Sequence, residues 1–260
     1  MNSDFNELIH WFRANKLSLN LSKTNYILFK PKHLKEEPPE RENLNIKFED
    51  VILEEKKDTK FLGIIIDEYL NWNQQCNSLH TKLSKGLYIL RSTKKQLPSE
   101  CLKTLYYSFI YCHITRGILL WGLNTYQNNL KRLTIQQKKS IRHIMNAKYN
   151  AHTHSYFKDL EILKLTDIIE HEMNKFTYSF NNHLLPVPLL NLFEINKDVH
   201  SYETRRKNDP RPPMHKSTYF NKSFLNKCPT LWSSLSPTIK DAKTRKTFTK
   251  LIKCQKIETY

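Results

Sequence analysis

The pattern of apolar and polar positions changes its period partway along the chain. Apolar residues recur every three or four positions over about 4–15, which predicts an amphipathic helix. Alternation then predicts a strand over 24–30, and two shorter strands over about 45–48 and 51–55 are spaced as a hairpin. The apolar run "KFLGIIID", which ends at Asp67, predicts a further strand buried on both sides or nearly so. This part of the chain is therefore expected to be α+β.

Beyond Asn71 the period becomes 3.6, which predicts a mainly helical remainder. A first helix is expected over 71–92, and a second begins at Pro98 and is broken or kinked at Gly117. A long basic helix follows over 126–147. Shorter helices are predicted at 154–160, 166–183, 187–194, 227–234 and 244–254.

The charge changes where the period changes. The formal net charge is +17 and the pI about 9.6. Residues 1–70 hold 11 Lys and Arg against 13 Asp and Glu, whereas residues 71–260 hold 31 against 12. We predict an α+β domain over 1–70, a helical region over 71–196, and a basic linker with C-terminal helices over 197–260. The excess positive charge predicts a polyanionic partner, either nucleic acid or an acidic membrane surface.

Composition disfavours several other classes of protein. The four glycines form no phosphate-cradling motif, and the five cysteines are scattered singly, without disulfide or zinc-site spacing. No apolar run is long enough to cross a bilayer, and the N-terminus lacks the features of a secretory signal. We therefore expect a soluble protein of the nucleus or cytoplasm, not secreted and not inserted in a membrane. The sequence does not specify an oligomeric state.

Candidate catalytic and metal-binding groups do not form a set. Adjacent carboxylates occur at Glu36–Glu37, at Glu54–Glu55 and at Asp67–Glu68, the last at a strand end, where acids of turns are common. His152 and His154 lie in a polar turn with no Cys or acid nearby in the sequence. We interpret these side chains as surface or turn residues, and expect no metal site in this chain.

The basic helix is the strongest candidate for a binding site. Its cations off the apolar stripe are Lys131, Arg132, Lys138, Lys139, Arg142 and Lys148. A solvated helix face usually contains acids as well, yet no Asp or Glu occurs between residues 126 and 158. This absence favours contact with phosphates. A second basic segment contains Arg205, Arg206 and Arg211, which either follow a nucleic-acid backbone or belong to an irregular linker.

Aromatic residues accompany these charges. They are Tyr106, Tyr107, Phe109, Tyr111, Trp121 and Tyr126. Aromatic rings near cations can stack on bases, but the helical spacing here favours a core position for most of them.

Several segments together resemble the reverse transcriptases of non-LTR retrotransposons. "HWFRANKLSLNLSKTNYILF" resembles the helix and "motif D" strand that follow the catalytic Asp-Asp hairpin. "TKFLGIIIDEYLNW" is similar to the primer grip and the start of the thumb. "LYYSFIYCHITRGILLWG" and "KCPTLWSSLSPTIKDAKTRKTFTKLIK" resemble the helical region and C-terminal end of jockey-like elements. The segments follow one another in the order expected for that family.

The resemblance implies roles for three residues. Lys23 matches the motif D lysine, which can stabilise charge on the leaving pyrophosphate and supply a proton. Alternatively, Lys23 is a solvated residue flanking a strand. Leu62 and Gly63 match the primer grip, where a glycine lets the backbone approach the primer closely. Alternatively, Gly63 marks a bend in a buried strand.

The resemblance also implies a function. The family activity is RNA-directed DNA polymerase, a nucleotidyltransferase that uses Mg²⁺ held by palm acids. In the family those acids lie upstream of the segments matched here, so we expect a palm remnant with thumb and C-terminal helices that is inactive alone. Such a chain would retain elements that bind a template–primer duplex of RNA and DNA. The alternative is a non-enzymatic nucleic-acid-binding protein, either a domesticated fragment or a relic.

Overall fold

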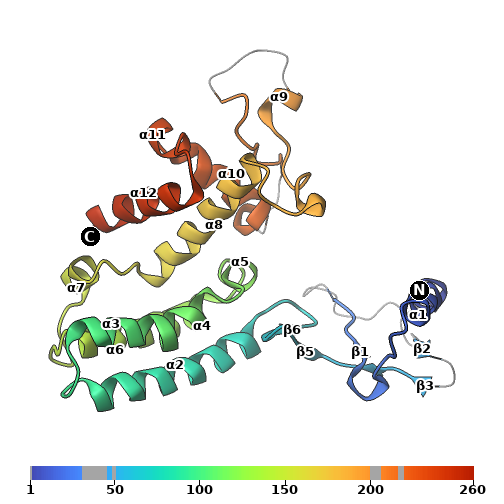
Figure 1. The fold of residues 1–260 in the computed structure, drawn as a ribbon, viewed down its shortest axis with the longest axis horizontal. Coiled ribbons are helices and arrows are strands. Elements are labelled where there is room, and N and C mark those ends of the chain that lie inside the picture. Colours follow the sequence, from blue (N-terminus) through green and yellow to red (C-terminus); the bar gives the residue numbers. More distant parts are fainter. Residues whose placement is uncertain (1, 31–45, 49–50, 200–205, 216–219) are drawn as a thin grey trace. The chain divides into compact units, whose positions relative to one another are not determined.

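The structure is a computed structural model in which the chain divides into two compact units, Met1–Gln74 and Gln75–Tyr260 (Figure 1). The residues that the structure describes are 2–30, 46–48, 51–199, 206–215 and 220–260. The first unit carries the short strands and the second is helical. The fold is therefore α+β and mostly helical, which confirms the predicted fold class.

The N-terminal unit combines one helix with small sheets. Its elements are α1 (Asn2–Ala14), the 3₁₀-helix η1 (Leu21–Lys23), β1 (Asn25–Tyr26), β2 (Lys47–Phe48), β3 (Val51–Ile52), β4 (Glu54–Glu55), β5 (Asp58–Phe61) and β6 (Ile64–Asp67). Strand β1 pairs with β4 in parallel, whereas β2–β3 and β5–β6 are antiparallel. The expected hairpin over 45–55 is confirmed where the structure describes it. The expected strand over 24–30 is shorter than predicted.

The segment "KFLGIIID" is a hairpin, so the prediction of a single buried strand is wrong. Strands β5 and β6 are joined by Leu62 and Gly63, whose φ angles are 47° and 86°. Two successive residues at positive φ are the signature of the tight I′ turn, whose twist matches that of the paired strands. Leu62 is 78% exposed at the tip, and all four residues of β6 are only half-buried.

The two acids at the end of β6 have structural partners. Asp67 accepts backbone hydrogen bonds from Tyr69, Asn71 and Trp72, at 3.2, 3.0 and 2.8 Å. The carboxylate of Glu68 lies 3.4 Å from the Lys30 ammonium. Asp67 therefore fixes the turn that leads into the next helix.

The C-terminal unit is built from helices of very different lengths. They are α2 (Asn73–Thr93), α3 (Ser99–Tyr106), the π-helix η3 (Tyr107–Tyr111), α4 (Cys112–Thr115), α5 (Ile118–Trp121), α6 (Gln127–Ile144), α7 (His154–Asp159), α8 (Leu165–Asn181), the 3₁₀-helix η4 (Val187–Leu189), α9 (Asn196–Val199), the 3₁₀-helix η5 (Phe220–Lys222), α10 (Phe224–Ser234), α11 (Pro237–Lys240) and α12 (Arg245–Glu258). The long helices agree with the predicted ranges to within a few residues. The helix expected over 187–194 is only the single turn η4, so that prediction is wrong.

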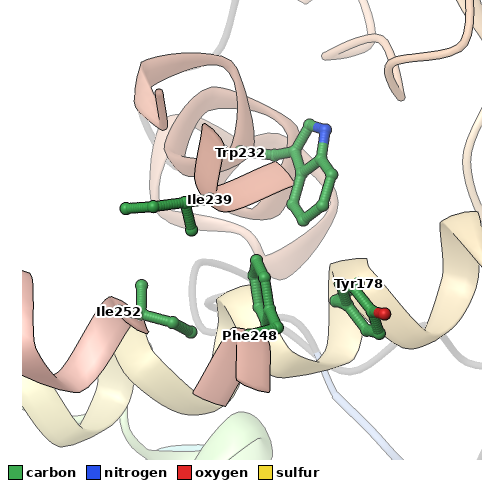
Figure 2. Close-up of a cluster of buried hydrophobic side chains, with 5 residues drawn as sticks. All are labelled: Tyr178, Trp232, Ile239, Phe248 and Ile252. Atoms are coloured by element: carbon green, nitrogen blue, oxygen red, sulfur yellow. The ribbon is translucent and has the colours of Figure 1, made fainter. Parts of the chain in front are cut away.

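A hydrophobic cluster joins the last helices of this unit. It consists of Tyr178 from α8, Trp232 from α10, Ile239 from α11, and Phe248 and Ile252 from α12 (Figure 2). The rings of Tyr178 and Phe248 stack with their centroids 4.4 Å apart, and the Tyr178 hydroxyl donates to a backbone carbonyl at 2.8 Å. Such burial of several large side chains supplies several kcal/mol of hydrophobic stabilisation.

Helix α2 packs closely against the π-helix at Gly86. A Cβ atom built at this position would lie 2.8 Å from the Phe109 carbonyl oxygen and 2.7 Å from Ile110 Cδ1. The glycine therefore permits a backbone approach that any larger residue would prevent.

Candidate nucleic-acid interface

Helix α6 is anchored by a buried glutamine. The Nε2 atom of Gln137 donates to the Tyr106 hydroxyl and to the Leu163 carbonyl, each at 2.9 Å, and its Oε1 accepts from the Leu165 amide at 2.9 Å. Leu133, Gln137 and Ile141 are buried at intervals of four residues and form the inner face of the helix. The opposite face is therefore held towards solvent.

That outer face carries the predicted cations. Lys131, Arg132 and Lys138 are exposed, and Lys139 and Arg142 are half-buried. At 100° per residue their positions fall within one sector of the helix, away from the inner face. In the part of the chain that the structure describes, none of the five has a carboxylate oxygen within 4.0 Å. Within the described residues, no acid neutralises the positive charge of this face.

Helix α2 lies beside α6. Arg132 donates to the Asn77 side chain at 2.9 Å, and one turn further the side chains of Gln136 and His80 meet at 2.8 Å. The contacts advance together along both helices, so the two helices run in the same direction. At the far end of α6, Arg142 Nε donates to the Ala151 carbonyl at 2.9 Å, which fixes the guanidinium.

The α2–α6 pocket opens where these two helices end. It is a cavity of about 420 Å³ lined by Leu87, Arg91, Lys94, Lys139, Arg142, His143, Ala147 and Tyr149. Four cations line it and no acid does. Neither Arg91 nor Lys94 has a carboxylate within 4.0 Å among the described residues. Cations at helix carboxyl ends are also favoured by the helix dipoles.

Sequence reasoning missed the contribution of Arg91 and Lys94 to this site. The prediction rested on the stretch without Asp or Glu over residues 126–158, which covers α6 and the residues after it but not α2. The same signal extends further, because residues 69–158 contain 14 Lys and Arg but a single acid, Glu100. A wider window would have pointed to α2 as well as α6.

Two histidines beside this face have lowered pKa values. Burial, followed by the charges of Lys94 and Arg91, lowers the pKa of His143. Burial, followed by the charge of Arg132, lowers the pKa of His80. Neighbouring cations disfavour a further proton on each ring, since like charges repel.

The predicted catalytic and primer-grip residues lie in the N-terminal unit. Lys23 ends η1 just before β1 and is exposed, with no partner for its ammonium among the described residues. Leu62 and Gly63 form the tip of the β5–β6 hairpin. The bend read at Gly63 is therefore a hairpin turn, and its role in gripping a primer stays a prediction.

The described residues of the second basic segment are attached to the helices through Asp209. Arg205 lies outside the described residues, Arg206 is exposed and Arg211 is half-buried. Asp209 accepts from Trp232 Nε1 and from Lys240 Nζ, each at 2.8 Å, which attaches the segment to α10 and α11. Arg206 and Arg211 thus belong to a segment attached to α10 and α11, whereas the α6 cations lie beside α2. In Figure 1, α9, which adjoins this segment, is drawn apart from α2 and α6.

The aromatic residues divide between core and surface. Tyr106 and Trp121 are fully buried, and Tyr107 and Tyr111 are half-buried. Phe109 and Tyr126 are exposed. The core position expected for most of them holds for the two fully buried rings. Tyr149, which sequence reasoning did not consider, is 82% exposed at the α2–α6 pocket.

The described residues form neither a metal site nor a membrane-spanning helix. Among the residues that the structure describes, no three His, Cys, Asp or Glu side chains come together as metal ligands, so these residues do not fit a polymerase metal pair. Within the same residues, no helix has both the length and the apolar character needed to cross a membrane.

The chain is similar in sequence to reverse transcriptases of insect mobile elements. A "Probable RNA-directed DNA polymerase from transposon X-element" of Drosophila melanogaster is 24% identical over 177 residues, which are 67% of this chain and 18% of that protein. The "RNA-directed DNA polymerase from mobile element jockey", also from Drosophila melanogaster, is 23% identical over 128 residues, which are 48% of this chain and 14% of that protein.

The matched stretch spans less than a fifth of the length of either curated relative. No protein-family model matches the chain, and no solved structure matches it. The two similarities support a relationship to the reverse transcriptase family of non-LTR elements.

Proposed function

We propose that this chain corresponds to the end of the palm, the thumb and the C-terminal helices of a non-LTR reverse transcriptase. In this proposal its C-terminal unit binds the sugar–phosphate backbone of a template–primer duplex of RNA and DNA. The contact surface is the outer face of α6 together with the end of α2. A protein of this kind that acts at chromosomal DNA works in the nucleus.

The observation that carries the proposal is the uncompensated charge of α6. Its five cations lie on one face and have no carboxylate within 4.0 Å among the described residues. An ordinary solvated helix mixes both signs of charge, whereas a backbone-binding surface does not. Phosphate contacts position a protein on a duplex without reading sequence, so binding should depend little on base identity.

A salt titration of duplex binding tests this proposal. If about five cations each neutralise one phosphate, the logarithm of the affinity falls with the logarithm of salt concentration at a slope of about −4 to −5. A variant with Arg132, Lys138, Lys139 and Arg142 replaced by Gln should flatten that slope by several units. Gln is a comparable helix former, so circular dichroism should report unchanged helix content.

A charge-matched variant provides the control. Lys243, Arg245, Lys246 and Lys250 are exposed residues in and beside α12, and their replacement by Gln removes the same total charge. That variant should keep the wild-type slope. Equal slopes for wild type and the α6 variant would overturn the proposal, and the segment with Arg206 and Arg211 would become the better candidate.

We further propose that these 260 residues do not synthesise DNA by themselves. Nucleotide addition needs two metal ions held by palm acids, and the described residues offer no such set. Lys23 and the Leu62–Gly63 hairpin tip would contribute to catalysis and primer binding only together with those acids. A primer-extension assay with Mg²⁺ should therefore yield no product, and metal-dependent extension by the purified chain would refute this part.

The second candidate is a nucleic-acid-binding protein without enzymatic activity. The same cationic face supports it, because backbone binding requires no catalytic group. Addition of a separately supplied palm and fingers portion of a related polymerase discriminates between the two. Restored primer extension supports the polymerase assignment, whereas binding without restored extension supports the second candidate.

A further inference from the structure

The α2–α6 pocket differs from the rest of the cationic face because it is concave and partly apolar. Leu87 and Ala147 line it together with the cations, and Tyr149 lies at it with 82% of its surface exposed. Its volume of about 420 Å³ falls within the range of small-ligand sites. A site for phosphate alone would need neither an apolar wall nor an aromatic ring.

We propose that the α2–α6 pocket binds one unpaired nucleotide of a single-stranded overhang, with its phosphate at the cations and its base on Tyr149. This inference rests on the proposed function, because it assigns a particular nucleotide of the bound nucleic acid to a particular place on the interface.

The phosphate half of the site is built by cations from two helices. Arg91 and Lys94 come from the end of α2, and Lys139 and Arg142 from α6. The Arg142 Nε–H is already bonded to the Ala151 carbonyl. Its terminal nitrogens have no other partner in the described part of the chain, so they remain for a ligand oxygen. A guanidinium held in this way presents a preformed fork to a phosphate.

The base half of the site favours an unpaired nucleotide over a paired one. Every base offers a flat face that can stack on an aromatic ring, but in a continuous duplex both faces are already covered. The end of a blunt duplex exposes one face of a terminal pair, but only an overhang or a frayed end offers a single unpaired base that can enter a pocket. The ring of Tyr149 can then cover that face at the mouth of the pocket, with little dependence on base identity.

The test compares three ligands with the full chain. They are a blunt RNA–DNA duplex, the same duplex with a short single-stranded overhang, and the same overhang made abasic. The wild-type protein should bind the base-bearing overhang more tightly than the blunt duplex. Tyr149→Ala should reduce that gain about fivefold or more, because a base–aromatic stack is worth at least about 1 kcal/mol. It should leave binding of the abasic overhang unchanged.

Tyr88→Ala is the matched control. Tyr88 is 72% exposed on α2 and does not line the pocket, so its removal should change none of the three affinities. Arg91→Gln tests the phosphate half of the site and should weaken both overhangs, with or without a base. Since Tyr88 and Tyr149 are both largely exposed, neither alanine variant should fail to fold.

Three results would overturn the inference. They are an absent overhang gain in the wild-type protein, a gain that survives Tyr149→Ala, and an equal loss in Tyr88→Ala. The salt slope of the blunt duplex reports on the proposed function separately. A normal slope with no effect of Tyr149 would reject the nucleotide pocket alone, whereas a flat slope would reject backbone binding itself.

Discussion

In the N-terminal unit, Lys30 lies 3.4 Å from Glu68 and Lys56 lies 3.4 Å from Glu54, whereas the α6 cations of the C-terminal unit have no carboxylate within 4.0 Å among the described residues. The exposed Lys56–Glu54 pair contributes at most about 1 kcal/mol to stability, whereas the Lys30–Glu68 pair is largely buried. Their main consequence here is that they neutralise cations of the first unit. The second unit also contains ion pairs, such as Lys240 with Asp209 at 2.8 Å, but among the described residues none of them involves α6, whose cations can meet an external anion.

The units differ in their cores as well. Among the described residues of the first unit, the buried hydrophobic side chains are Ile9, Leu53 and Trp72, and Phe61 and Leu62 are exposed. The second unit buries complete clusters such as the one in Figure 2. In the second unit, the cations of α6 lie on the face opposite its buried residues. The lysines of α6 can therefore be removed without loss of core packing, whereas two of its arginines also bond to neighbouring segments.

The largest effect is expected from a truncation in the buried cluster. Phe248→Ala removes a fully buried ring that stacks on Tyr178, and should lower the free energy of unfolding by about 3–5 kcal/mol. Phe61→Ala, in the first unit, removes a ring that is 62% exposed and should change it by less than about 0.5 kcal/mol. Urea unfolding followed by tryptophan emission measures both. Similar values would contradict the contrast between the two cores.

The next effect concerns the polar anchor of α6. Gln137→Leu leaves the Leu163 carbonyl and the Leu165 amide without their hydrogen-bond partner. This should lower the free energy of unfolding by about 3 kcal/mol. Gln127→Leu places the same side chain at an exposed position of the same helix and should be nearly neutral. Thermal melting of both variants checks the expectation. An unaffected Gln137→Leu protein would mean that α6 is held by its apolar face alone.

The sequence predicted the long helices well because their signal is local. Residues 71–92 and 126–147 have an apolar period of 3.6, and the structure places α2 and α6 within three residues of those limits. The hairpin at Leu62 was missed because a continuous apolar run fits one buried strand as well as two paired ones. The helix over 187–194 was wrong because Pro186 and Pro188 each lack an amide donor, and η4 closes with two short-range bonds only.

The candidate site was predictable only in part. The absence of acids around α6 predicts that its cations belong to a binding site. That Arg91 belongs to the same site could not be predicted, because it requires α2 and α6 to run side by side in the same direction. That arrangement rests on side-chain contacts such as Arg132 with Asn77, which are 55 positions apart in the sequence. No local pattern carries this information.

Smaller losses of stability are expected when alanine replaces either of two glycines, one in each unit, that the backbone geometry requires. Gly86→Ala would place a methyl group 2.8 Å from a backbone oxygen and should cost about 1–3 kcal/mol through forced separation of α2 and η3. Gly63→Ala, in the first unit, puts an alanine at a φ of 86° and should cost about 1 kcal/mol, confined to the hairpin. Hydrogen exchange of the backbone amides distinguishes the two variants, because Gly63→Ala should speed exchange only over residues 58–67. Exchange that rises throughout the chain for Gly63→Ala would contradict a local effect.

The smallest effect is a pH dependence of stability. Burial lowers the pKa of His80, His113 and His143, and nearby cations lower it further. The cations facing these rings are Lys82, Arg91, Lys94, Arg116, Arg132 and Lys139. Because the unfolded chain binds these protons more readily, stability should fall as the pH drops below about 6.5, the ordinary histidine value.

Melting temperatures at pH 7.5 and 5.5 measure this pH dependence. Replacing the three histidines by Gln should make the decrease smaller. If the variant instead lost as much stability as the wild type, other groups would account for the pH dependence. No such decrease is expected from the cations themselves, which stay charged throughout this range.

Lysine acetylation footprinting with and without duplex compares nucleic-acid binding by the two units in one experiment. Bound duplex should slow acetylation of Lys94, Lys131, Lys138 and Lys139 several-fold, whereas Lys16, Lys57 and Lys60 of the N-terminal unit should react at unchanged rates. All three of these control lysines are exposed in the structure. Protection of the N-terminal lysines with no protection on α6 would contradict the assignment of nucleic-acid binding to the C-terminal unit.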